Sequence, residues 1–101
     1  MYNQGDTITF ILDYTVNDAS LVSYNPDEIE FCIGDKTYTK TDGDIAIDSD
    51  SGKYAVNIGQ ADSFDFDRTT KYQIRIKKGS VVVSSSIERM IIGDSISRTV
   101  L

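Results

Sequence analysis

Short runs in which apolar and polar residues alternate most limit how this chain can fold. In the first run, apolar side chains occupy every second position from Ile8 to Tyr14. In an extended strand, successive side chains point to opposite faces, so one face repeats every two residues, whereas in a helix the repeat is about 3.6 residues. The same alternation recurs at 29–33, 45–47, 54–58 and 72–76, with turn-forming residues between the runs, and residues 36–40 form a further short run after a tight turn. An all-β fold is therefore predicted.

The composition also favours strands over helices. Isoleucine and valine together number twenty, whereas leucine and alanine number seven. Branched side chains pack well on a pleated sheet and lose rotamer freedom in a helix. Thirteen aspartates stand against three glutamates, which indicates that most acidic residues serve turns.

Glycine and aspartate pairs mark the predicted turns. Gly34 and Asp35 separate two alternating runs by two residues, the signature of a tight hairpin. Residues 17–27 are rich in turn formers and predict a connection. Residues 60–67 predict one helical turn capped by Asp62 or Ser63, with Phe64 and Phe66 closing one end of the core.

The last long run, 80–92, has apolar and polar residues on both faces. We expect it to bend, bulge or change sheets near residues 84–86. About seven short strands then result, which is typical of an immunoglobulin-like antiparallel β-sandwich. Residues 1–101 form one predicted domain, and residues 94–101, after Gly93, are an extending tail that pairs as an edge strand or reaches into a neighbour.

Several enzyme chemistries are excluded by the residue types present. The chain has no histidine and a single cysteine, Cys32, which excludes Ser-His-Asp and Cys-His catalysis and a histidine-bound zinc. Nothing marks two carboxylates as a buried catalytic pair. Cys32 lies on a strand face with no basic neighbour in sequence to lower its pKa. We therefore predict no catalytic residues, no cofactor and no enzymatic activity.

Two further groups are weak candidates for binding. Calcium takes several closely spaced oxygen ligands, and an acidic stretch offers Asp42, Asp44, Asp48 and Asp50. Its spacing does not fit an EF-hand, so solvated turn aspartates and an irregular calcium site both stay open. Among the tyrosines, Tyr14, Tyr54 and Tyr72 are expected on core faces, while Tyr2, Tyr24 and Tyr38 are candidate contact residues.

Charge is distributed unevenly along the chain. The net charge is -6, which argues against nucleic-acid and anionic-membrane partners. Residues 1–67 hold three basic and fourteen acidic residues, a net charge of -11, whereas residues 68–101 hold seven basic and two acidic ones, a net charge of +5. Either the strands interleave and mix these charges, or a basic surface meets an acidic partner. The second interpretation gives an interface of Arg75, Lys77, Arg89, Ile96, Arg98, Val100 and Leu101.

The order of several segments resembles a known family. The segments are Gly5-Asp6-Thr7 before the first strand, residues 29–33 before a tight turn, residues 47–58 (IDSDSGKYAVNI), residues 70–76 (TKYQIRI) and a last strand ending at 90–93 (MIIG). In this order they are similar to the small Ig-like modules of tailed-phage virion proteins, especially the N-terminal domain of the baseplate upper protein family. The chain lacks the usual glycine or proline near residues 68–70.

The resemblance implies a non-enzymatic structural subunit of a phage or prophage tail, baseplate or neck. Its partners would be other virion proteins, with a homo-oligomer or ring in the assembled particle. Such a particle assembles in the bacterial host cytoplasm, and residues 1–10 carry no signal-peptide pattern. The alternative is an adhesin-like or carbohydrate-binding β-sandwich module, which would gather exposed aromatic rings on one surface.

Overall fold

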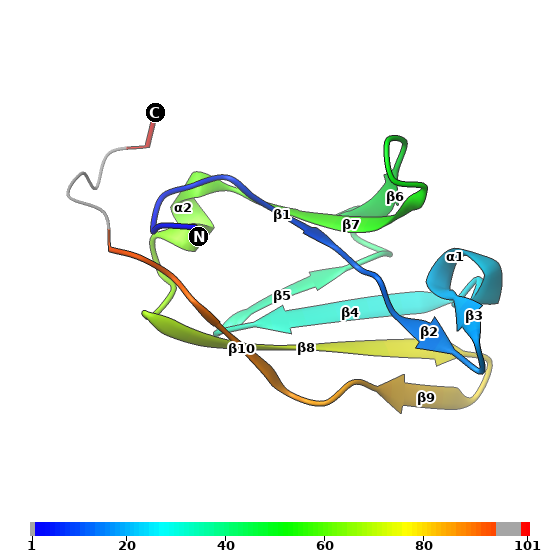
Figure 1. The fold of residues 1–101 in the computed structure, drawn as a ribbon. Coiled ribbons are helices and arrows are strands. Elements are labelled where there is room, and N and C mark those ends of the chain that lie inside the picture. The colour runs from blue at the N-terminus through cyan, green and yellow to red at the C-terminus, as the bar shows by residue number, and fades with distance from the viewer. Residues whose placement is uncertain (1, 95–99) are drawn as a thin grey trace.

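The computed structural model describes residues 2–94 and 100–101 and places two antiparallel sheets face to face (Figure 1). The first sheet has the order β1-β7-β6, with β1 at Ile8–Ile11, β7 at Lys53–Ile58 and β6 at Ile45–Asp48. The second has the order β10-β8-β4-β5, with β10 at Glu88–Ile91, β8 at Thr69–Lys78, β4 at Glu28–Ile33 and β5 at Lys36–Thr39. A fifth strand, β9 at Val81–Ser84, also pairs with β8. The predicted all-β fold is confirmed.

The core lies between the two sheets because alternate residues of each strand point inward. Ile29, Phe31 and Ile33 of β4 are fully buried, whereas the residues between them are not. The Phe10 ring of β1 lies 5.1 Å from the Phe31 ring, centroid to centroid, and so joins the two sheets. Offset and tilted aromatic pairs of this kind stabilise a core beyond the area they bury.

Tight turns set the strand register. Ile33 pairs with Lys36, so Gly34 and Asp35 form the predicted two-residue hairpin, and Gly34 has a φ of +58°. A second such hairpin joins β2 (Thr15–Val16) to β3 (Ala19–Ser20), where the sequence predicted only a connection. Its two central residues, Asn17 and Asp18, have φ values of 51° and 66°. Positive φ at both positions matches the twist of the flanking strands.

Two short helices close the ends of the sandwich (Figure 1). Helix α1 spans Leu21–Tyr24. Its N-cap is Ser20, whose hydroxyl oxygen accepts a hydrogen bond from the N–H of Ser23. Helix α2, Gln60–Ser63, is the predicted helical turn, but the predicted caps are wrong because its N-cap is Gly59. Ser63 lies inside the helix, and its hydroxyl donates to the Asp6 carbonyl at 2.7 Å.

Phe66 is buried, as expected for a residue that closes one end of the core, whereas Phe64 is half-buried. The Phe64 ring lies against Gly5, where an added Cβ would meet the ring at 2.4 Å. Gly5 also has a φ of +85°, so this close approach and the backbone conformation both require glycine.

The final strand contains a β-bulge rather than a change of sheet. Both β9 and β10 pair with the same edge of β8, and residues 85–87 stand opposite residues 73–74. Ser85 holds the bulge, because its N–H donates to the Ile74 carbonyl at 2.9 Å and its hydroxyl oxygen accepts the Ile74 N–H at 3.1 Å. Of the three alternatives predicted near residues 84–86, a bend, a bulge or a change of sheet, the structure has the bulge. The bulge splits one predicted strand in two and, with the β2–β3 hairpin, gives ten strands in the described residues instead of the predicted seven or so.

Removing the Ser85 hydroxyl should weaken the fold at this bulge. The substitution Ser85→Ala leaves the Ile74 N–H without its acceptor, and an unpaired buried donor costs about 1–3 kcal/mol. We expect a loss of that size in the free energy of unfolding, measured by urea titration. The matched control Ser84→Ala, at an exposed position, should change it by less than about 0.5 kcal/mol. Equal effects of the two substitutions would contradict this role for Ser85.

Candidate interaction surface

Exposed apolar side chains gather along the edge formed by β9 and β10. Val81, Val82 and Val83 are 54%, 51% and 40% exposed, and Ile87 and Ile91 are more exposed still. These five residues, which we call the β9 surface, are half of the large apolar residues exposed in the described part of the chain. Val81 and Val83 lie on the inner face of the sheet and Val82 on the outer face, so apolar side chains are exposed on both faces of this edge. Exposed apolar residues that cluster in this way commonly mark interaction sites.

Strand β9 is also an edge strand without charge. Among the described residues it pairs with β8 alone, so its other edge has unpaired backbone groups. No charged residue occurs from Gly79 to Ile87. Edge strands are commonly protected by charged residues, and the edge strands β5 and β6 carry Lys36 and Asp48. The composition of β9 therefore favours pairing with another chain.

The widths of the two sheets explain why the valines are exposed. Val83 pairs with Ile76 and shares its inward face, yet Val83 is exposed whereas Ile76 is buried. The sheet that covers this face has three strands, whereas the sheet that contains β9 has five. A hollow of about 60 Å³ lies beside Val83, where Tyr14 and Leu21 border it.

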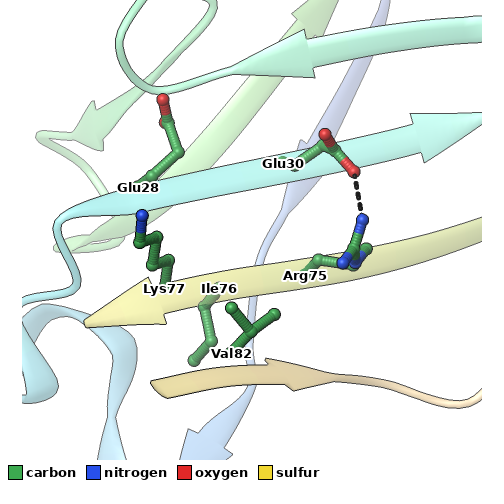
Figure 2. A pocket seen from close by; sticks show the side chains of 6 residues that line it. All are labelled: Glu28, Glu30, Arg75, Ile76, Lys77 and Val82. Carbon is green, nitrogen blue, oxygen red and sulfur yellow. Dashed lines mark ion pairs between the residues drawn. The ribbon is translucent and has the colours of Figure 1, made fainter. Parts of the chain in front are cut away.

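Two of the predicted interface residues, Arg75 and Lys77, lie on the outer face of β8 beside β9. Figure 2 shows them around a shallow hollow of about 160 Å³, lined by Glu28, Glu30, Arg75, Ile76, Lys77 and Val82. An Nη atom of Arg75 lies 3.5 Å from Glu30 Oε1, and Lys77 pairs in register with Glu28. The β4–β8 pairing thus mixes charges from the two halves of the sequence.

Glu28 stays ionised beside Lys77. Partial burial alone would raise the pKa of Glu28, but hydrogen bonds from the Thr41 hydroxyl and from the backbone N–H groups of Ile29 and Thr41 lower it. These hydrogen bonds hold the carboxylate as a fixed negative charge, and Figure 2 shows it turned away from the Lys77 ammonium. The hollow is consequently close to neutral and offers no strong attraction for a charged ligand.

A third predicted interface residue, Arg89, lies in a more positive setting. It pairs in register with Lys71, so two like charges are neighbours across β8 and β10. No described carboxylate lies within ion-pair distance of either side chain. An acidic residue of a partner would relieve their repulsion.

The remaining predicted interface residues belong to the tail. Ile96 and Arg98 lie outside the described residues. Val100 and Leu101 are exposed, and the Leu101 N–H donates to Gln60 Oε1 at 2.6 Å.

The acidic stretch that was weighed as a calcium site forms turns. Asp44 and Asp48 accept hydrogen bonds from the backbone N–H groups of Thr39 and Ser51, respectively. Over residues 2–94 and 100–101, no three carboxylate or thiol side chains converge in a way that could hold a metal ion.

The three tyrosines expected on core faces lie there, whereas Tyr38, expected as a contact residue, is buried as well. Tyr54 is buried, and Tyr14 and Tyr72 pack against the core. Tyr38 is only 8% exposed, so the interpretation of Tyr38 as a contact residue is wrong. Its partner in register is Phe31, which places both rings on the inner face.

Tyr2 and Tyr24 do not form a shared aromatic surface. The N-terminus lies beside α2, whereas α1, which contains Tyr24, lies at the opposite end of the sandwich (Figure 1). Tyr24 is half-buried, and Lys78 Nζ lies 4.7 Å from its ring centroid. The flat aromatic platform that sugar binding needs is not present among these three rings.

Cys32 is half-buried on the outer face of β4. Its thiol donates to Glu30 Oε1 at 3.4 Å. Burial and the Glu30 carboxylate raise the pKa of this thiol, which disfavours the reactive thiolate.

Comparisons with known proteins assign no family to this chain. No protein-family model matches it, and neither a curated protein nor a solved structure does. In the described residues, no helix is both long and apolar enough to cross a membrane.

Tyr38 should make the free energy of unfolding fall at alkaline pH. Burial and the hydrogen bond to Asp62, at 2.7 Å, raise the pKa of Tyr38. Because the folded-state pKa lies above the unfolded value of about 10, this contribution to stability is present below pH 10 and is lost as the pH rises further.

We expect the free energy of unfolding to fall more steeply above about pH 10 in the wild type than in Tyr38→Phe. The difference in slope should approach roughly 1.4 kcal/mol per pH unit, measured by urea unfolding between about pH 8 and pH 11. Tyr2→Phe, at an exposed ring, is the control and should keep the wild-type slope. Parallel curves for the wild type and Tyr38→Phe would contradict the prediction.

Proposed function

We propose that this chain is a non-enzymatic structural subunit of a phage or prophage virion, in the tail, baseplate or neck, that acts through protein contacts made by its β9 surface. The observation that carries the proposal is the exposed, uncharged edge strand at Val81–Ser84. The assignment to a virion rests on the resemblance in segment order, and the assembly role rests on this edge.

Edge strands of this kind join other chains by β-augmentation, in which main-chain hydrogen bonds extend a sheet across the interface. An antiparallel pairing of two β9 strands about Val82 would place Val82 opposite Val82 and Val81 opposite Val83. No like charges would then face each other, because residues 79–87 carry none. The pairing buries apolar side chains and satisfies open backbone groups at the same time.

The strand order supports the immunoglobulin-like assignment. In such folds the second, fifth and fourth strands form one sheet, and the third, sixth and seventh form the other. Here β1, β7 and β6 correspond to the first set, and β4, β8 and β9–β10 to the second, with β5 beside β4. The parallel bridge between Asn3 and Gly93 corresponds to a first strand that meets the last.

The proposed partners are other virion proteins and further copies of this chain, assembled in the host cytoplasm. Repeated copies in a ring need contacts that recur from subunit to subunit. The β9 surface and the Arg89–Lys71 pair offer an apolar and a basic element on the same sheet edge. The carbohydrate-binding alternative has less support, because Tyr2, Tyr24 and Tyr38 do not gather on one surface.

Placing a charge on β9 should abolish self-association. We expect wild-type protein to show a molar mass that rises with concentration in light scattering, and Val82→Lys to remain a monomer at the same concentrations. Val82 is half-exposed on the outer face, so the substitution leaves the core intact. Lysine on an edge strand opposes pairing with another strand.

The matched control places the same charge on the opposite edge of the sheet. Thr37→Lys, at an exposed position of β5, should keep the wild-type association. Wild-type protein that stays monomeric at every concentration and ionic strength would contradict self-assembly through β9. Equal loss of association in both variants would show that net charge, rather than the β9 edge, controls it.

A further inference from the structure

A groove separate from the β9 surface opens between the two sheets, where β1 faces β10. Its volume is about 320 Å³, and its lining residues are Phe10, Ile11, Leu12, Asp13, Tyr14, Phe31, Tyr72 and Glu88. Phe10, Phe31 and Tyr72 form its floor, with ring centroids 5.1 to 5.9 Å apart. Phe31 is fully buried, whereas Phe10 and Tyr72 are half-buried and present part of their rings to the groove.

The two strands that border this groove each have an unpaired edge. Among the described residues, β1 pairs only with β7, and β10 pairs only with β8. The bridge between Asn3 and Gly93 lies beyond the end of β10 and does not cover the groove. Open backbone groups on both sides favour an occupant in extended conformation, because such a chain can form main-chain hydrogen bonds with a strand edge.

The rim of the groove carries a negative charge without a cationic partner. Glu88 accepts a hydrogen bond from the Ser86 hydroxyl at 3.0 Å, and no described lysine or arginine lies within ion-pair distance of it. Asp13, in contrast, lies 2.9 Å from Lys53 Nζ. Burial, the neighbouring Tyr72 and the Glu88 carboxylate raise the pKa of Tyr14, so that ring stays neutral beside Glu88.

Aromatic faces next to an unpaired carboxylate are the chemistry that recognises a cation. A lysine or arginine side chain is attracted by the ring faces and by the carboxylate together. The net charge of -6 adds a general attraction for a basic partner. Apolar side chains on either side of the cation would cover the exposed parts of Phe10 and Tyr72.

We propose that this groove binds an extended segment of a partner protein in which a lysine or arginine lies between two apolar side chains. The cation pairs with Glu88, the apolar neighbours lie on Phe10 and Tyr72, and the backbone follows the open edge of β1. The groove adjoins the β9 surface at Glu88 but shares no residue with it, so substitutions at Glu88 and at Val82 test the groove and the assembly role separately.

The test uses the full chain and a synthetic probe, acetyl-Thr-Val-Thr-Arg-Thr-Val-Thr-amide, titrated while backbone amide resonances are recorded by NMR. We expect the probe to shift the resonances of residues 10–14 and of Glu88. A second probe with citrulline in place of arginine keeps the shape and removes the charge. It should bind roughly tenfold more weakly, because its neutral ureido group can still donate to the carboxylate but lacks the positive charge that strengthens such a hydrogen bond.

Two variants with the same change in net charge make the test specific. Glu88→Gln keeps the oxygen that accepts from Ser86 and should weaken binding of the arginine probe to the level of the citrulline probe. Asp50→Asn, in an exposed turn, should leave the affinity unchanged. Absence of shifts at residues 10–14, or equal weakening by the two variants, would overturn the proposal.

Discussion

The packing of Phe10 against Phe31 is the contact on which the rest of the structure depends. It joins β1 of the three-stranded sheet to β4 of the five-stranded sheet, and Tyr72 of β8 completes the cluster. Burying such rings contributes to the stability of the core beside the isoleucines that make up much of it. The three-stranded sheet that holds β1 is narrower than the five-stranded sheet that it faces. Strands β9 and β10 form the sheet edge that we propose for assembly. The groove that contains Glu88 lies between β10 and β1.

Local pattern was sufficient for much of the fold. The alternation in β4 and β8 predicts both strands and their buried faces, and Gly34 with Asp35 predicts the hairpin and its register. The Asn17–Asp18 hairpin was not predicted, because these residues adopt positive φ in many kinds of turn. Tyr38 was misplaced because Thr, Tyr and Lys in β5 give no clear apolar face. Only its pairing with Phe31 sets which side points inward.

The candidate surface was harder to predict because it depends on which strands are neighbours. Sequence shows that Val81, Val82 and Val83 are apolar, but a period of two does not tell whether a strand is central or at an edge. The charge asymmetry along the sequence left two interpretations open, and the pairing of β8 with β4 shows that part of the basic charge is mixed with acidic residues of the first half. That Arg75 lies beside Glu30 whereas Arg89 lies beside Lys71 follows from long-range pairings of β8 with β4 and β10. The groove at Glu88 likewise arises from segments distant in sequence.

If β9 is the edge through which this chain joins other copies, amide hydrogen exchange measured across a concentration series should detect the pairing. Pairing with another strand would protect backbone N–H groups that are open in the monomer. We expect exchange at Val81–Ser84 to slow as the protein concentration rises, while exchange in β5 stays constant. Unchanged exchange in β9 under conditions where the molar mass increases would show that association uses another surface and would contradict a pairing through β9.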